Sequence, residues 1–244
     1  MLVAAAVCPS PPLLVPAVAA GAAPELDAVR AACADALGVL AAARPERLVV
    51  VGPAERDRRG EHPSGTVGSF RGFGVDLDVV LGGGTAAAQA GAGESPGREL
   101  PASLAVAAWL LERAHWAAAP VSGLGVGEPL DAERCVRTGR EIAARAGRVA
   151  LLVMGDASAC RSLKAPGYLD ERAAGFDEEV ARALRTADVA ALKALDAELA
   201  YELKAAGRAP WQVLAGAAEG AGLGGELLYE DAPYGVGYLV AAWS

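Results

Sequence analysis

The sequence is poor in the residues that usually build metal, redox and nucleic-acid sites. Its 244 residues include only two histidines, His62 and His115. Its four cysteines form no Cys-x-x-Cys pair, which disfavours a metal or redox role and favours buried free thiols. The formal net charge is −8 and the basic residues are scattered among acidic ones, so we expect no nucleic-acid partner.

Long hydrophobic runs and nucleotide-binding loops are also missing. No stretch is long enough to span a membrane without proline, glycine or charge, so we expect no membrane partner. The apolar residues 1–8 lack the positive segment and the length of a signal peptide, which predicts a cytoplasmic protein. The glycine-rich residues 82–84 and 125–129 lack the dinucleotide fingerprint, and neither a Walker motif nor a nucleophile elbow occurs.

Strand-like and helix-like segments alternate along the chain. Short apolar or β-branched runs typical of strands cover 2–7, 46–53, 75–82, 119–127 and 148–159. Helical spacing of apolar residues is found in 24–43, 100–116, 130–147 and, in pieces, 170–223. Residues 225–243 resemble a hairpin of two strands. The alternation predicts a single α/β domain over residues 1–244, with a mixed or mostly parallel sheet flanked by helices.

Polar or special turns follow three of the predicted strands. The first strand stops at a proline-rich turn that holds Ser10, because proline cannot donate to a sheet. The second ends in Gly-Pro before Ala54, and the fifth ends with Asp156 and Ser158. Ligands of open α/β sheets bind outside the carboxyl ends of the strands, so we expect these four residues to lie close together. Ordinary strand-to-helix turns would give the same pattern without a site, with Asp156 bonded to turn amides rather than to a ligand.

Seven stretches, which span nearly the whole chain in order, resemble the subunit-B type of class III extradiol ring-cleavage dioxygenases, in particular an actinobacterial branch. They are "CPSPPLLVP", "RLVVVGP", "GSFRGFGVDLDV", "LPASLAVAAWLLE", "MGDASACRSLKAPGYLDERA", "GRAPWQVLAGAA" and "APYGVGYLVAAW". The resemblance implies an α/β fold with a non-haem Fe(II) held at the strand ends by two histidines and a glutamate. It also implies a further histidine that acts as acid and base on a catechol-type substrate.

The positions that the resemblance assigns to the iron site carry other residues in this chain. The first ligand histidine of the family lies in a His-Pro-Pro turn, where this chain has Ser10. Ala54 stands where the second ligand follows a proline, and Ala159 follows Ser158 where the family has its acid/base histidine. Glu230 is the loosest match, to the glutamate ligand. Ring cleavage needs imidazoles and a carboxylate on one face of the metal and a base for the phenolic proton, so the resemblance implies a lost iron site.

Two functions follow as expectations. The first is a divergent, homodimeric member of the superfamily that needs no cofactor, does not cleave rings, and binds a small molecule or a partner protein. The second is a metal-dependent oxidoreductase or hydrolase that holds Fe(II) or another divalent metal through displaced ligands, namely His62, Asp156 and Glu230. The sequence leaves open whether the chain is an enzyme. His62 lies in a charged loop that looks solvated, and His115 lies near a helix end, where a surface role is expected.

Charged and thiol side chains near the fifth predicted strand add two smaller expectations. Arg161 and Lys164 could bind a carboxylate or a phosphate, although a salt bridge to the acidic residues 170–179 is favoured. Cys8 and Cys160 flank the same region and could form a thiolate pair, but the sequence contains nothing that visibly lowers their pKa values.

Overall fold

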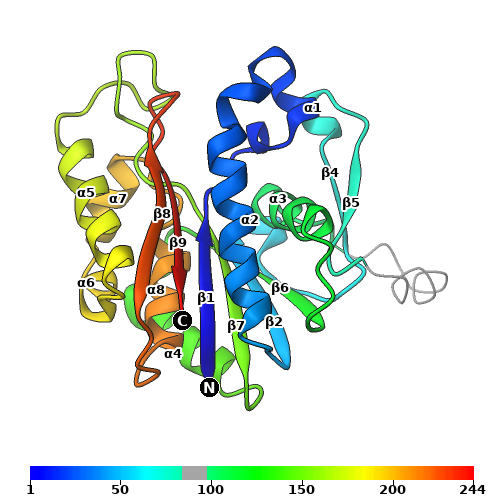
Figure 1. The fold of residues 1–244 in the computed structure, drawn as a ribbon. Helices are drawn as coiled ribbons and strands as arrows, with labels where there is room; N and C mark the ends of the chain where they lie inside the picture. Colours follow the sequence, from blue (N-terminus) through cyan, green and yellow to red (C-terminus); the bar gives the residue numbers. More distant parts are fainter. Residues whose placement is uncertain (84–97) are drawn as a thin grey trace.

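A mixed seven-stranded sheet forms the centre of the protein in the computed structural model, which describes residues 1–83 and 98–244 (Figure 1). The strand order is β3-β6-β2-β7-β1-β9-β8, and β4 and β5 form a separate two-stranded sheet. The four central strands β6, β2, β7 and β1 are parallel, whereas β3, β9 and β8 run antiparallel to their neighbours. The strands are β1 Leu2–Cys8, β2 Arg47–Pro53, β3 Gly60–His62, β4 Val67–Ser69, β5 Asp78–Val80, β6 Val121–Val126, β7 Val149–Met154, β8 Gly225–Asp231 and β9 Tyr238–Trp243.

Helices cover both faces of the sheet. Side chains of α2 and α3 pack on one face, and side chains of α4 to α8 pack on the other (Figure 1). The helices are α1 Pro16–Ala19, α2 Asp27–Ala42, α3 Ala102–Arg113, α4 Ala132–Ala143, α5 Arg172–Arg185, α6 Val189–Lys193, α7 Ala197–Glu202 and α8 Arg208–Ala217. Short 3-10 segments are η1 Pro12–Leu14, η2 Ala20–Leu26, η3 Arg56–Arg58 and η4 Arg71–Phe73. The architecture confirms the predicted α/β class with a mixed sheet flanked by helices.

The central strands β1 and β7 are apolar along their whole length because both of their faces are covered. In β1, Ala4 and Ala6 belong to the core beneath α2 and α3, whereas Ala5 and Val7 belong to the core beneath α4 to α8. Successive side chains of a strand point to opposite faces, so a strand buried on both sides needs a continuous apolar run. This is why β1 and β7 lack the polar alternation of a surface strand.

Glycine brings two helices on the second face into backbone contact. A Cβ atom added at Gly139 of α4 would lie 2.0 Å from the carbonyl oxygen of Val213 in α8, and one added at Gly216 would lie 2.0 Å from the carbonyl oxygen of Val136. Any larger side chain at either glycine would force the helices apart. The glycines therefore fix the spacing of the helix pair that covers β2 and β7.

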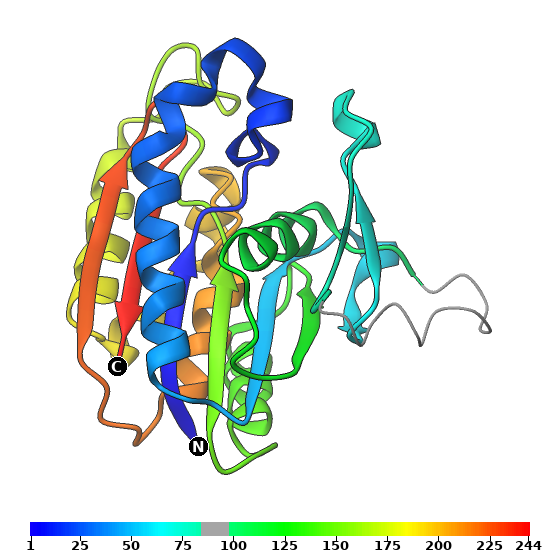
Figure 2. The same ribbon diagram turned by 45° about the vertical axis from the view of Figure 1, so that its right-hand side comes forward.

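The β4–β5 hairpin stands apart from the central sheet (Figure 2). The sequence predicts a strand over 75–82, but only Asp78–Val80 is extended, and it pairs with β4 instead of joining the main sheet. Phe70 and Val79 are buried and attach the hairpin to the core beneath α3. In residues 1–83 and 98–244, no helix has both the length and the apolar character that crossing a membrane requires.

Candidate site at the carboxyl ends of the strands

The proline-rich turn after β1 is tied to the turn after β7. The backbone N–H of Ser10 donates to Oδ1 of Asp156 at 2.7 Å, and the N–H of Gly155 donates to the carbonyl oxygen of Cys8 at 3.0 Å. β1 and β7 are adjacent parallel strands, so their ends meet at the same edge of the sheet. Asp156 thus makes the bond to a turn amide that the sequence allows, and it holds the rigid turn in place.

Asp156 lies in an environment that disfavours its charge. Burial raises the pKa of the Asp156 carboxyl to about 6, and the Ser10 N–H opposes this rise. Burial, and then the charge of Asp156, raise the pKa of Tyr238 at the start of β9. Tyr238 is buried in the core beneath α2 and α3. Ser10 is also buried, so this end of β1 is a packed polar contact.

Ala54 and Ala159 take part in the fold through their backbones. The N–H of Ala54 donates to the carbonyl oxygen of Val126 at 2.8 Å, and the N–H of Ala159 donates to that of Leu203 at 2.9 Å. Ala54 follows β2, which β7 separates from β1, so it lies two strand spacings, or about 9.6 Å, across the sheet from the end of β1. The structure brings Ser10 and Asp156 into contact and leaves Ala54 further along the same edge.

The residues at these positions do not fit a non-haem iron. Ser10, Ala54 and Ala159 offer a hydroxyl and two methyl groups where Fe(II) would need imidazoles. Within residues 1–83 and 98–244, no group of three or more His, Cys, Asp or Glu side chains could hold a metal ion.

The alternative ligand set of His62, Asp156 and Glu230 is wrong. His62 belongs to β3 and Glu230 to β8, which are the two outer strands of the seven-stranded sheet. Six spacings of about 4.8 Å separate these strands, or about 29 Å along the sheet, so the two side chains cannot share one ion. His62 is also buried and not in a solvated loop, because Gly60–His62 pairs with β6. Its Nε2 lies 2.8 Å from the carbonyl oxygen of Arg58.

The other histidine and the cysteines have structural positions. His115 is exposed just beyond the end of α3, as the sequence predicts. Cys8 and Cys160 belong to cores on opposite faces of the sheet and do not form the pair that the sequence suggests. The neighbour of Cys8 is Cys33, and a hydrogen bond with that thiol, followed by burial, raises the pKa of Cys8 well above its ordinary value. All four cysteines are free and buried, which confirms the default expectation.

A second polar cluster joins the turn after β7 to α5. Asp177 is buried and accepts from the backbone N–H of Ser158 at 2.8 Å, from the Ser158 hydroxyl at 2.9 Å and from Nη1 of Arg161 at 3.0 Å. Burial raises the pKa of the Asp177 carboxyl, and the bonds from Ser158 and Arg161 oppose that rise. The salt bridge of Arg161 to the acidic stretch 170–179 is therefore formed, as predicted.

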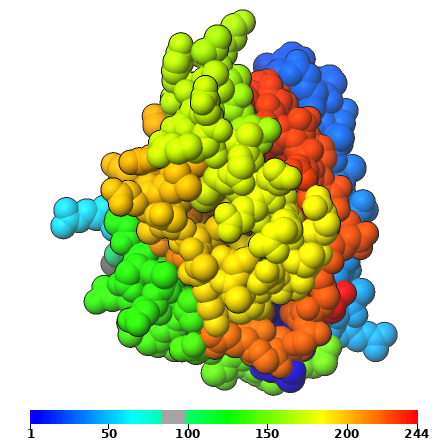
Figure 3. Space-filling view, turned by 90° about the vertical axis from the view of Figure 1, so that its left-hand side faces the viewer, coloured from blue at the N-terminus to red at the C-terminus, as the bar shows by residue number. Residues whose placement is uncertain are grey.

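The Asp177 cluster borders a cavity of about 490 Å³. The lining residues come from the loop after β7, from α5 and from the β8–β9 hairpin: Arg161, Asp177, Glu230, Asp231, Ala232, Gly237 and Leu239. Figure 3 shows this side of the molecule, where the yellow-green loop after β7 lies against the red hairpin turn. The N–H of Arg161 donates to the carbonyl oxygen of Gly235 at 3.0 Å, which fixes the loop to that turn. Of the sequence-predicted site residues, Glu230 is the one that lines this cavity.

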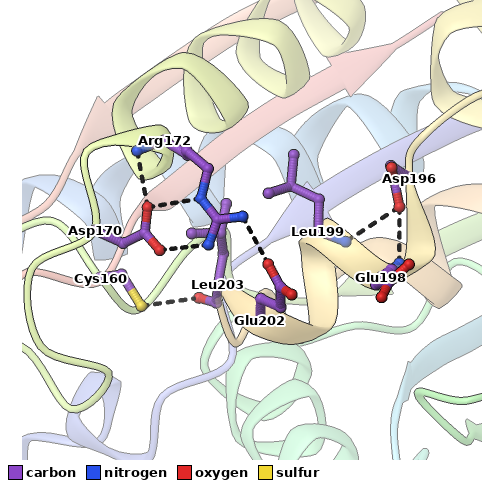
Figure 4. A network of polar contacts seen from close by, with 8 residues as sticks. All are labelled: Cys160, Asp170, Arg172, Asp196, Glu198, Leu199, Glu202 and Leu203. Atoms are coloured by element: carbon purple, nitrogen blue, oxygen red, sulfur yellow. Dashed lines mark hydrogen bonds and ion pairs between the residues drawn. The ribbon is translucent and has the colours of Figure 1, made fainter.

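Ion pairs hold the end of the loop between β7 and α5 where α5 begins (Figure 4). Arg172 donates to Asp170 at 2.7 Å and to Glu202 of α7 at 2.6 Å. The Cys160 thiol donates to the carbonyl oxygen of Leu203 at 3.5 Å. Both ends of the loop that carries Arg161 are thus attached to the helices of the second face.

Sequence reasoning did not single out Asp177, although a signal was present. Asp177 follows Phe176 and lies between Ala173 and Val180, on the apolar stripe of α5. A charged residue on the buried face of an amphipathic helix requires a polar partner. That requirement would have marked Asp177 as a buried polar residue, although not which residues are its partners.

Comparisons with known proteins support the fold and go no further. No protein-family model matches the chain, and no curated protein sequence matches it. The chain is similar in structure to a protein whose crystal structure is described as uncharacterized protein JW3007 from Escherichia coli K12, with a TM-score of 0.54. The two chains are 17% identical, and the match covers 99% of each. At this identity the likeness shows a shared α/β fold over the whole chain.

Proposed function

We propose that the chain is a divergent class III extradiol dioxygenase-like protein that does not cleave aromatic rings and binds a small molecule at the carboxyl edge of its sheet. The observation that carries the proposal is the state of the inherited turn after β1. Its prolines frame Ser10, and the Ser10 N–H is bonded to Asp156, so the rigid turn is kept without a ligating side chain. We further propose that the protein is cytoplasmic and forms a homodimer. Light scattering on a gel-filtered sample tests the dimer.

The chemistry of the side chains supports this proposal over the enzymatic alternative. An Fe(II) oxygenase needs at least two imidazoles and a carboxylate on one face of the ion, and a base to accept the phenolic proton. Ser10, Ala54 and Ala159 provide no imidazole, no carboxylate and no base. A hydrolase with displaced ligands would need a cluster of metal-binding side chains, and residues 1–83 and 98–244 hold no group of three or more His, Cys, Asp or Glu that could bind a metal ion.

A ring-cleavage assay tests the enzymatic half of the proposal. The purified protein is incubated with catechol and with 3,4-dihydroxybenzoate, with and without added Fe(II), and formation of the yellow ring-opened product is followed by absorbance. We expect no product above the rate of free Fe(II), because a missing general base alone costs about 10²–10⁴ in rate. Turnover at an enzymatic rate would refute the proposal.

A further inference from the structure

The cavity beside α5 contains a guanidinium group that is fixed on one side and free on the other. Nη1 of Arg161 donates to the buried Asp177, which Ser158 holds through two further hydrogen bonds. Within the described part of the chain, Nη2 and Nε of Arg161 have no partner, and the side chain is 35% exposed. A guanidinium held in this way presents donors to a carboxylate at little further entropic cost.

The opposite wall of the cavity carries negative charge. Glu230 of β8 is 44% exposed, and its Oε2 accepts from Arg185 of α5 at 3.2 Å. Asp231 follows it in the same strand and accepts from the backbone N–H of Ala232 at 2.7 Å. Asp177 pairs with Arg161, and Glu230 pairs with Arg185, so the charged groups at the cavity are three carboxylates and two guanidinium groups. A ligand therefore meets charges of both signs at this cavity.

Gly237, which lines the cavity, allows the hairpin to lie close to Asp177. A Cβ atom added at Gly237 would lie 2.6 Å from Oδ2 of Asp177 and 2.8 Å from Cβ of Ala157. The backbone just before β9 can therefore approach the carboxylate that orients Arg161. The two charged walls are then formed by separate elements, the loop after β7 and the β8–β9 hairpin, which the Arg161–Gly235 backbone bond holds together.

We infer that this cavity binds a small zwitterion, whose carboxylate is received by Arg161 and whose ammonium group is received by Glu230. The inference rests on the proposed function, because it names the ligand class of the small-molecule site. A ligand with both charges can pair with Arg161 and with Glu230, whereas a ligand with one charge can pair with only one of them. The cavity volume of about 490 Å³ is sufficient for a molecule of amino-acid size.

Matched amino acids and single-charge analogues test the inference by titration calorimetry on the full chain. The probes are glycine, β-alanine and 4-aminobutyrate, which separate the two charges progressively, with butanoate and butylamine as analogues that lack one charge. We expect at least one zwitterion to bind and both analogues of 4-aminobutyrate to bind more weakly than the best zwitterion, by about tenfold or more. If no zwitterion binds, or if one analogue binds as tightly as the best zwitterion, the inference is wrong.

Variants assign the binding to this cavity. Glu230→Gln changes an exposed rim residue and should weaken zwitterion binding about tenfold. Arg161→Gln should weaken zwitterion binding at least as much. If that variant does not fold, Arg161→Lys is used in its place. Glu226→Gln, on the same strand but outside the cavity lining, should bind as the parent does. Unchanged binding in Glu230→Gln and in the Arg161 variant would overturn the inference. Ring cleavage in the catechol assay would refute the proposed function and leave this binding result untouched.

Discussion

Replacement of Asp156 by asparagine should stabilise the protein at neutral pH. In the folded chain, burial raises the pKa of this carboxyl from 3.8 to about 6, against the opposing effect of the Ser10 N–H. In the unfolded chain the pKa returns to its ordinary value, so the folded state binds the proton more tightly. The stability that this tighter proton binding contributes is fully present below about pH 4 and is lost as the pH rises through about 6.

The magnitude follows from the size of the pKa shift. About two units correspond to at most about 3 kcal/mol of stability that the parent chain lacks at neutral pH, because Asp156 is only half-buried. Asparagine keeps a carbonyl oxygen for the Ser10 N–H, which lies 2.7 Å from the present carboxylate oxygen, and it has no charge to desolvate. We expect Asp156→Asn to be about 1–3 kcal/mol more stable than the parent near pH 8 and about equal to it near pH 4. The lower limit of about 1 kcal/mol allows for the side-chain NH₂ group of the asparagine, which needs a hydrogen-bond partner of its own.

Urea unfolding followed by tryptophan fluorescence, from about pH 4 to about pH 8, measures the effect. Asp156→Ala is the control, because it removes the charge and also the acceptor of the Ser10 N–H. It should be less stable than Asp156→Asn at every pH, by about 1–3 kcal/mol. If the free energies of unfolding of the parent and of Asp156→Asn change by the same amount over this pH range, the carboxyl does not titrate with a raised pKa and the reasoning fails.

Three further predictions concern the proline-rich turn after β1, the contact between α4 and α8, and the thiols. The double variant Ser10→His, Ala54→His should bind Zn(II) more tightly than the two single variants together imply, because both imidazoles would share one ion; binding no better than the parent in calorimetry would show that the two positions do not converge. Gly139→Ala should destabilise the fold by about 1–3 kcal/mol or more in chemical denaturation, since its Cβ would lie 2.0 Å from a carbonyl oxygen of α8. Gly38→Ala in α2, where nothing lies within 4 Å of the added atom, should instead be neutral or stabilise by up to about 1 kcal/mol, and equal losses in the two variants would contradict the packing argument. Cys8 and the other thiols should react with a chromogenic disulfide reagent only as fast as the chain unfolds, because all four are buried; rapid labelling of the folded protein would contradict this.

The sequence predicted the fold well where local chemistry decides the structure. Proline stops β1 at Cys8, and the apolar run of β7 is explained by helices on both faces. The predicted hairpin at the C-terminus is formed by β8 and β9. The hairpin of β4 and β5 was not foreseen, because pairing of two three-residue strands depends on contacts with α3 that no local pattern reveals.

The location of the candidate site could be predicted from the sequence, but the hydrogen-bond partners of its side chains could not. Strand-end logic places Ser10 and Asp156 at one edge, and the structure joins them by a hydrogen bond. The same logic cannot say that Ser158 faces α5, because its partner Asp177 lies 19 positions further along the chain and on a helix. His62 shows the opposite limit, since a charged neighbourhood suggested exposure but pairing of β3 with β6 buries the ring.

The turn after β7 makes contacts on both faces of the sheet, and these contacts give the proline-rich turn after β1 a structural role. Asp156 bonds to the turn after β1 and lies near Tyr238 in the core beneath α2 and α3. Two residues later, Ser158 bonds to Asp177 in the core beneath α5. A change in the β1 turn would therefore disturb Asp156 and, through the same short segment, the carboxylate that orients Arg161. On this reasoning the rigid turn after β1 supports the cavity that we propose as a zwitterion site, a task that needs no metal ligand in the turn.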